Sequence, residues 1–161
     1  MLDVYTDGSS VGSTGPGGWA FWCENTEESR VGNHPETTNQ RMELQAAFEA
    51  MRFFHQPLRI ISDSRYVVNC FHQKWYVKWM KNGWRSSQKK PVMNQDLWQP
   101  MIEHYLEKPE KYEFKWVRGH TGVYGNEMAD RLAVEAKESL TTMGVITTGS
   151  VDRLIAKRST Q

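Results

Sequence analysis

Hydrophobic and polar positions along the chain first follow the pattern of short strands. Three segments near the N-terminus contain strand-forming residues and are separated by Gly-rich or polar turns, which predicts an antiparallel meander. A later apolar run, Leu-Arg-Ile-Ile-Ser, is typical of a buried central strand. A fifth segment alternates, with Tyr112, Phe114 and Trp116 on one side. The expected strands cover residues 2–7, 17–24, 29–34, 58–62 and 112–119.

Elsewhere the apolar positions take the 3.6-residue period of amphipathic helices. In the first helix, residues 38–54, the apolar stripe consists of Leu44, Ala47, Phe48 and Met51. Thr37 and Gln40 offer a capping box at its start, and Pro57 ends the helical region. Further helices are expected at residues 65–73, 75–80, 94–106 and 127–138, the last with an apolar face of Ala129, Leu132, Ala133 and Ala136. Pro100 fits best near the first turn of its helix.

Strands separated by helices, after an antiparallel opening, predict an α/β fold with a mixed sheet and helices packed on its faces. A chain of 161 residues suits one domain better than two. From residue 139 to 161 the chain is rich in Thr, Ser and Gly and ends with basic residues. We therefore expect a domain over residues 1–138 and a C-terminal extension over 139–161, which is either flexible or an appendage.

Composition excludes membrane and disulfide-rich classes. The chain is 39% hydrophobic and 24% charged, without an apolar run long enough to span a membrane. The N-terminus has neither the basic segment nor the apolar core of a signal peptide, so we expect a cytoplasmic location. Cys23 and Cys70 form no metal-type CxxC and are expected to be buried apolar residues rather than reactive thiols.

Charge is unevenly distributed, although the net charge is only +1. The segment 71–95 holds six basic residues and no acidic one, which leaves 14 basic and 19 acidic residues elsewhere. Its basic residues Lys74, Lys78, Lys81, Arg85, Lys89 and Lys90 are interleaved with Trp75, Tyr76, Trp79 and Trp84. Such a mixture suits a surface that follows a phosphate backbone. The alternative is a solvated helix face with tryptophans in a local core, as we expect for Trp75 and Trp84.

Four carboxylates stand out by position: Asp7, Glu43, Asp63 and Asp130. Asp7 is expected to end the first strand, and Asp63 follows the central strand at its carboxyl end, where open α/β sheets place their sites. Glu43 and Asp130 lie about 100° from the centres of their helices' buried faces, at the border, so each can lean over the sheet edge without being buried alone, which would be costly. Singly, each acid has an ordinary interpretation as a turn, helix-start or helix residue.

The case for chemistry depends on all four carboxylates meeting in space. They would repel one another strongly unless cations lay among them, and Mg²⁺ prefers such oxygen ligands. Two ions about 4 Å apart form the clamp that is used for in-line phosphodiester hydrolysis. The pattern therefore favours a two-metal site over four unrelated acids.

Five sequence blocks resemble those of the type 1 ribonuclease H family, in family order and spacing, over about residues 1–138. The blocks are "YTDGS", "TTNQRMEL", "ISDSRYVVN", "WMKNGWRSSQKKPVMNQDLW" and "FKWVRGHTGVYGNEMADRLA". The resemblance implies a ribonuclease H-like fold, in which a five-stranded mixed sheet with its first three strands antiparallel is flanked by helices. It also implies an endonuclease that cuts the RNA strand of RNA/DNA hybrids, leaves 5′-phosphate and 3′-hydroxyl ends, and has little sequence specificity.

The same resemblance assigns roles to individual residues. The four acids match the family's metal-binding positions, which implies two Mg²⁺ ions, with Mn²⁺ as a possible substitute. His120 matches a histidine thought to help proton transfer or product release; the alternative is an ordinary surface-loop histidine. The basic segment matches the protrusion by which bacterial members contact the DNA strand. The implied nucleic-acid contacts are Gly8, Ser9, Ser13, Thr38, Asn39, Gln40, Arg65, Lys78, Trp79, Lys81, Trp84, Lys89 and Lys90.

Three other interpretations keep the fold but change the function. They are a hybrid-binding module without catalysis, a related nuclease with another substrate, and the ribonuclease H portion of a larger polymerase. The complete acidic set argues against the first, and the "TTNQRMEL" block with the Trp-rich basic segment against the second. Because Met1 lies only a few residues before the first strand, we expect a chain that stands alone. The preferred interpretation is a monomeric, Mg²⁺-dependent endoribonuclease acting on RNA/DNA hybrid duplexes.

Overall fold

The computed structural model describes residues 1–143 of the chain. Its strands are β1 (Leu2–Ser10), β2 (Gly17–Cys23), β3 (Ser29–His34), β4 (Leu58–Ser62) and β5 (Tyr112–Trp116). Its α-helices are α1 (Asn39–Phe53), α2 (Arg65–His72), α3 (Trp75–Lys81), α4 (Gln95–Glu107) and α5 (Tyr124–Met143), with a short 3-10 helix at Pro109–Lys111. Every strand and helix expected from the sequence is present; β3 and β4 have the expected bounds, and the other elements have shifted ends. Most of the expected C-terminal extension lies outside the described residues.

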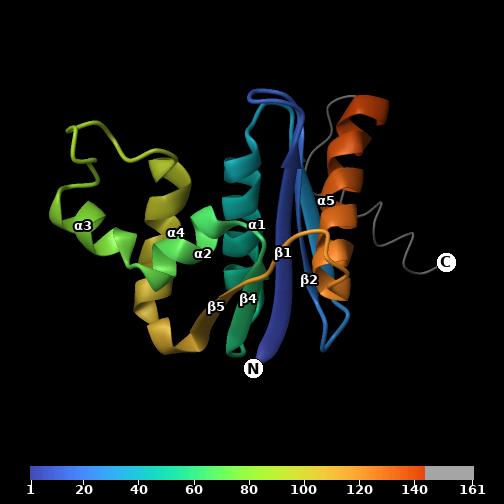
Figure 1. Ribbon diagram of the computed structural model, residues 1–161, viewed down its shortest axis with the longest axis horizontal. Coiled ribbons are helices and arrows are strands. Elements are labelled where there is room, and N and C mark those ends of the chain that lie inside the picture. The colour runs from blue at the N-terminus through green and yellow to red at the C-terminus, as the bar shows by residue number, and fades with distance from the viewer. Residues whose placement is uncertain (144–161) are drawn as a thin grey trace.

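The five strands form one mixed sheet in the order β3-β2-β1-β4-β5 (Figure 1). The first three strands are antiparallel, whereas β4 pairs in parallel with both β1 and β5. The predicted five-stranded mixed sheet with an antiparallel opening is therefore confirmed. Because β1 and β4 are parallel neighbours, their carboxyl ends meet at the same edge of the sheet.

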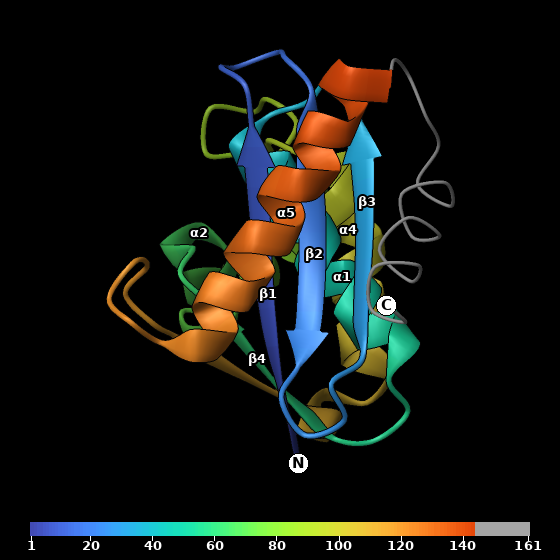
Figure 2. The same ribbon diagram turned by 90° about the vertical axis from the view of Figure 1, so that its right-hand side faces the viewer.

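Helices cover both faces of the sheet. Helix α1 packs on one face, and α5 crosses the other obliquely over β1, β2 and β3 (Figures 1 and 2). Helices α2, α3 and α4 lie beyond α1, on the side away from α5 (Figure 1). None of the helices in the described part of the chain is both long and apolar enough to cross a membrane.

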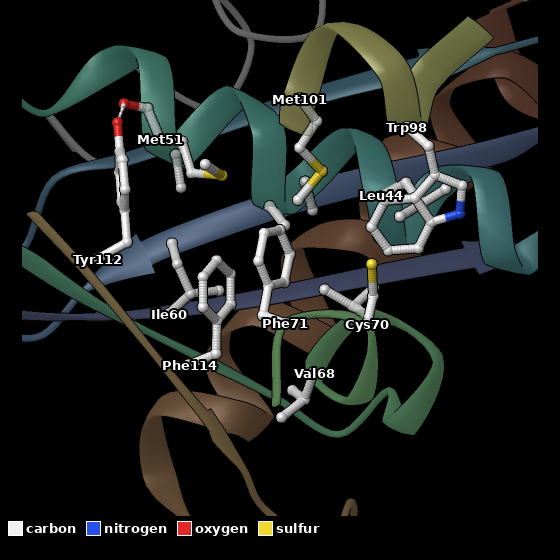
Figure 3. Packing of buried hydrophobic residues seen from close by; sticks show 14 of the residues in the cluster. Leu44, Met51, Ile60, Val68, Cys70, Phe71, Trp98, Met101, Tyr112 and Phe114 are labelled. Atoms are coloured by element: carbon white, nitrogen blue, oxygen red, sulfur yellow. Dashed lines mark hydrogen bonds between the residues drawn. The ribbon is translucent and has the colours of Figure 1, made fainter. Parts of the chain in front are cut away.

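The main hydrophobic core lies between the sheet, α1, α2 and α4 (Figure 3). Phe71 and Phe114 stack with ring centroids 3.7 Å apart, and the fully buried Trp98 packs against Phe71. Tyr112 donates a hydrogen bond to the Met51 carbonyl at 3.3 Å. A second, smaller cluster joins β2 and β3 to the predicted apolar face of α5, through Ala20, Trp22, Val31, Leu132, Ala133 and Ala136. Both expected buried cysteines are buried.

Strand β1 is longer than predicted. Asp7 was expected to end it, but the antiparallel ladder to β2 continues from the Asp7–Ala20 pair to Ser10–Gly17. The parallel ladder to β4, by contrast, stops at the Thr6–Ser62 pair. Asp7 therefore lies inside a strand, at the point where one of its two neighbours ends.

Three helix predictions are wrong in detail. The N-cap of α1 is Thr38, whose hydroxyl accepts a hydrogen bond from the Arg41 N–H at 3.2 Å, so Thr37 and Gln40 form no capping box. Pro100 lies inside α4 rather than in its first turn. Because proline has no backbone N–H, α4 lacks one hydrogen bond there. Helix α5 extends beyond the predicted 127–138 at both ends.

Candidate active site

Sheet register brings Asp7 and Asp63 together. Both residues directly follow the last parallel pair of β1 and β4, Thr6–Ser62, so they lie side by side at the edge where β4 ends. The ordinary interpretation of Asp63 as a helix cap does not hold, because Ser64 caps α2 by accepting from the Val67 N–H at 3.2 Å. The Asp63 carboxylate is thus available for another role.

Glu43 reaches the same place from α1. One oxygen each of Asp7, Glu43 and Asp63 can be chosen so that all three lie within 4.8 Å of one another. Gly8 permits this approach, since a Cβ at residue 8 would collide with the backbone of Met42 and Glu43. Glu43 is 6% exposed, and it is buried beside Asp7 rather than alone. The buried face of α1 is wider than its apolar stripe and includes the Glu43 position.

Asp130 completes the predicted set from α5, on the opposite face of the sheet. It is half-buried, and it lies close enough to Asp7 to help raise the pKa of that carboxyl. The other three predicted acids therefore lie around Asp7, although Asp130 stands outside the tightest group of three found among the described residues.

Burial and mutual repulsion disturb the titration of these acids. Burial raises the pKa of Asp7 to about 7, although a hydrogen bond with Glu43 opposes the rise, and the charges of Asp63 and Asp130 add to it. Burial, with the charge of Asp7, also raises the pKa of Glu43 well above its ordinary value. Strongly perturbed acids of this kind are typical of functional sites.

The residues fit a divalent cation. Among the described residues, the buried Glu43 Oε2 has no hydrogen-bond partner, which is costly for a carboxylate oxygen unless a cation or water binds it. The donor set is entirely carboxylate oxygen, the ligand type that Mg²⁺ and Mn²⁺ prefer. A cation among these oxygens would also relieve the repulsion between them.

Asn126, in the first turn of α5, is a site residue that the sequence reasoning missed. It is 2% exposed and its Nδ2 donates to Asp63 Oδ2 at 3.2 Å. The Trp116 indole donates to the Asp63 carbonyl at 3.0 Å, so Asp63 is fixed at both its side chain and its backbone. The signal in the sequence is the spacing of Asn126 and Asp130, which places both on one face of α5.

The loop that carries His120 lies against the acids. A Cβ at Gly119 would be 2.7 Å from Asp63 Oδ2, so the backbone beside His120 touches the site. His120 itself is exposed and has a positive φ of 57°. This position is compatible with its predicted role, which stays a prediction.

The predicted contacts at the carboxyl end of β1 lie on both faces of the sheet. Ser9 is on the α5 face like Asp7, and its hydroxyl accepts from Lys137 Nζ at 3.0 Å. The Ser10 N–H donates to the Asn39 side chain at 3.1 Å, which ties the start of α1 to β1. Gln40 and Ser13 are exposed. The start of α1 therefore presents free N–H groups and polar side chains beside the acids.

The basic segment forms a protrusion made of α3 and the loop that leads to α4 (Figure 1). Its lysines Lys78, Lys81, Lys89 and Lys90 are exposed. Trp84 is 9% exposed and Trp79 is half-buried against Trp75, Trp84 and Trp98, so these rings belong largely to a local core. The Arg65 guanidinium stacks over the Trp116 ring, with its Cζ atom 4.0 Å from the ring centroid. Binding by any of these residues stays a prediction.

A hydrogen-bonded network that the sequence reasoning also missed ties the protrusion to α1. Arg41 donates to both Asp96 carboxylate oxygens, at 2.9 and 2.6 Å, and to the Asn94 side chain at 3.3 Å. Asn94 and the buried Trp98 indole both donate to the Tyr66 hydroxyl, at 3.1 and 2.7 Å. The network fixes the start of α4 against the starts of α1 and α2.

Comparisons with known proteins agree with this geometry. A family model described as RNase H matches residues 1–138. The Ribonuclease H of Symbiobacterium thermophilum is 46% identical over 134 residues, which are 81% of this chain and 90% of that protein. The Ribonuclease H of Erythrobacter litoralis is 43% identical over 141 residues, which are 85% of this chain and 96% of that protein.

Solved structures show the same fold. LC9-RNase H1, described as a type 1 RNase H with the type 2 active-site motif, is 29% identical with a TM-score of 0.69, over 91% of this chain and 76% of that one. A foamy viral protease-reverse transcriptase in complex with dsDNA is 24% identical with a TM-score of 0.74, over 86% of this chain and 94% of that one, and shows the fold alone.

Strand order and helix placement thus define the protein as one of the ribonuclease H fold class. The chain belongs to the RNase H family and is a type 1 enzyme like those of bacteria. It is therefore a ribonuclease rather than a binding module without catalysis.

Proposed function

We propose that the protein is an endoribonuclease that hydrolyses the RNA strand of RNA/DNA hybrids with little sequence specificity, leaving 5′-phosphate and 3′-hydroxyl ends. The observation that carries the proposal is the group of Asp7, Glu43 and Asp63 oxygens within 4.8 Å, with Asp130 beside Asp7. A monomeric state and a cytoplasmic location belong to the same proposal.

We infer that Asp7, Glu43, Asp63 and Asp130 hold two Mg²⁺ ions, for which Mn²⁺ would substitute. Such a pair of ions supplies a water of lowered pKa for attack and stabilises the charge on the leaving oxygen. The side chains must be ionised to bind, and the raised pKa of Asp7 and Glu43 means that protons compete with metal ions at both. Asn126 holds Asp63 Oδ2 in the orientation that ligation needs.

The substrate would lie across the carboxyl edge of β1 and β4. Free N–H groups at the start of α1 favour a phosphate near Thr38, and Asn39 and Gln40 can reach a 2′-hydroxyl, the group that distinguishes RNA from DNA. The exposed lysines of the protrusion would follow the DNA strand. Because these contacts are to backbone and sugar, sequence selectivity should be low. His120 would assist proton transfer or product release from its exposed loop.

The test is cleavage of labelled RNA/DNA, RNA/RNA and DNA/DNA duplexes of one sequence, with Mg²⁺ and with excess EDTA. We expect cutting of only the RNA in the hybrid, and only with metal. Asp63→Asn should fold and bind the hybrid but lose nearly all cleavage, whereas Glu110→Gln, an exposed acid of the 3-10 helix, should behave like the parent. Full activity of Asp63→Asn, full activity in EDTA, or preferred cutting of DNA/DNA would refute the proposal.

A further inference from the structure

Lys137 is a cation beside the acidic site that none of the roles above explains. It lies in the same helix as Asp130, seven residues later. Seven residues bring a helix back to within about 20° of the same direction, about 10.5 Å further along its axis. Lys137 therefore shares the sheet-facing side of α5 with Asp130 and stands two turns beyond it.

Asp130 and Lys137 contact successive residues on one face of β1. Asp130 interacts with Asp7, and Lys137 Nζ donates to the Ser9 hydroxyl at 3.0 Å. Asp7 and Ser9 are two residues apart in an extended strand, so they share a face and are separated by about 6.8 Å. The approach is close because residue 18 on β2, which pairs with Ser9, is Gly: a Cβ there would lie 2.6 Å from the Lys137 backbone nitrogen.

An ion pair does not account for this position. No salt bridge within the described residues includes Lys137, and its side-chain ammonium there contacts the neutral Ser9 hydroxyl. An ammonium group has three donor hydrogens, so two stay available after one is given to Ser9. The Ser9 hydroxyl accepts from Lys137 and keeps its own hydrogen for another acceptor. The two side chains thus keep donor hydrogens for a further acceptor beside the acids.

The protrusion is assigned to the DNA strand in the proposed function, on which this inference rests. It lies on the α1 side of β1, whereas α5 lies on the other (Figure 1). A duplex that places its DNA strand over the protrusion would carry the RNA strand past Asp7 on the side of α5. The rise of about 3.4 Å per nucleotide is measured along the helix axis, and adjacent phosphates lie farther apart along the backbone, so about 6.8 Å corresponds to one or two nucleotides.

We propose that Lys137, with the Ser9 hydroxyl, binds a phosphate of the RNA strand within about two nucleotides of the cleaved bond. Lysine binds phosphate as a point charge, and here its ammonium is already held by Ser9. Lys137 is in this sense a positioning residue: it fixes the register of the RNA strand over the acids and does not touch the reacting atoms.

The test measures binding separately from cleavage. Asp63→Asn serves as the parent, and a fluorescently labelled RNA/DNA hybrid is titrated in Mg²⁺ at several salt concentrations. Adding Lys137→Ala should weaken binding by about threefold to fivefold and make the slope of log K against log salt shallower by about one. Lys137→Arg should keep most of the affinity. Lys108→Ala, an exposed lysine at the end of α4, is the matched control and should change neither quantity.

A second measurement locates the contact. A series of hybrids is prepared, each with one neutral methylphosphonate linkage at a different position of the RNA strand. At one position near the cut, the linkage should weaken binding by the parent but not by the Lys137→Ala variant. An unchanged salt slope, or an identical pattern of weakening in both proteins, overturns the inference. So does a lowered Tm of Lys137→Ala with an unchanged slope, since that result assigns Lys137 to the stability of the acidic site.

Cleavage of the same hybrid by the wild-type chain in Mg²⁺ is recorded in parallel. A wild-type chain that binds the hybrid with the expected Lys137 effect but leaves the RNA intact refutes the proposed function alone. A chain that binds and cuts but is indifferent to Lys137→Ala refutes the Lys137 inference alone. A parent that does not bind the hybrid refutes both.

Discussion

At the scale of single residues, the carboxylates that suit the acidic site to metal binding also destabilise the metal-free fold. Asp7 and Glu43 are buried carboxylates that interact directly, and one Glu43 oxygen has no partner among the described residues. Buried like charges are costly, and the raised pKa of both groups expresses that cost. The metal-free protein should therefore be stabilised by whatever removes one of the charges.

Asp7→Asn should stabilise the metal-free fold at high pH. The pKa of Asp7 is raised from 3.8 to about 7, so between these values the folded chain holds a proton that the unfolded chain has lost. Stability then falls as pH rises through this window, by at most about 1.4 kcal/mol per pH unit for one such group. In EDTA at pH 8 we expect the Tm of Asp7→Asn to exceed that of the wild type by roughly 3–8 °C.

The same comparison at pH 5 should show a smaller difference, because most of the native Asp7 is then protonated. Saturating Mg²⁺ at pH 8 should raise the Tm of the wild type more than that of Asp7→Asn, since the ion binds only the intact acidic site. Thermal unfolding of both proteins, followed by circular dichroism, gives the Tm under all three conditions. If the Tm of the two proteins depended on pH in the same way, the assignment of the raised pKa to Asp7 would be contradicted.

Asn126→Ala should weaken metal binding while leaving the acids in place. Loss of the Nδ2 donor frees Asp63 to rotate, and removal of such a supporting hydrogen bond commonly costs 10-fold to 100-fold in metal affinity. We expect the Mg²⁺ concentration for half-maximal cleavage to rise by roughly tenfold, with recovery of much of the rate at high Mg²⁺. Asn25→Ala, at an exposed turn, is the control. A lowered maximal rate with an unchanged Mg²⁺ dependence would assign Asn126 to substrate binding instead.

At the scale of elements, the position of the protrusion depends on the contacts at the start of α4. The Arg41–Asp96 pair is largely exposed, with side chains 32% and 64% accessible, so it contributes little to stability by itself. The Tyr66 hydroxyl is different, since it accepts from the fully buried Trp98 indole and from Asn94. Tyr66 therefore ties α2 to α4 at the base of the protrusion.

Tyr66→Phe should destabilise the fold and loosen the protrusion. It leaves the buried Trp98 N–H without its acceptor, which typically costs about 1–3 kcal/mol. Chemical denaturation should report a loss of that size, and the KM for the hybrid should rise more than kcat falls. The matched change is Tyr124→Phe, because Tyr124 is 63% exposed and packs edge-on against Trp22. Equal stabilities of the two variants would show that Trp98 finds another acceptor.

At the scale of the whole molecule, strand and helix order followed from the sequence because their periods are set by local geometry. Asp63 was predictable as a site residue for the same reason: it follows an apolar run that could only be a central strand. The burial of Glu43 was not, because the period locates one apolar stripe but not what packs beside it. Asn126 was missed because an Asn near a helix start normally suggests a cap. Its true partner, Asp63, is distant in sequence and adjacent only in the fold.

The end of the catalytic domain gives the last prediction. The resemblance and the family model both stop at residue 138, but α5 continues to Met143 and Leu140 is only 7% exposed. A chain that ends at residue 143 should therefore keep the Tm and the cleavage rate of the full chain. A chain that ends at 138 loses the burial of Leu140, worth about 1.5–3 kcal/mol, and its Tm should fall by roughly 5–10 °C. Leu140→Ala in the full chain separates the two causes, because it should reproduce most of that loss without shortening the helix. If ending the chain at 143 already lowers the Tm or the rate, the extension takes part in the domain and the boundary proposed at 138 is wrong.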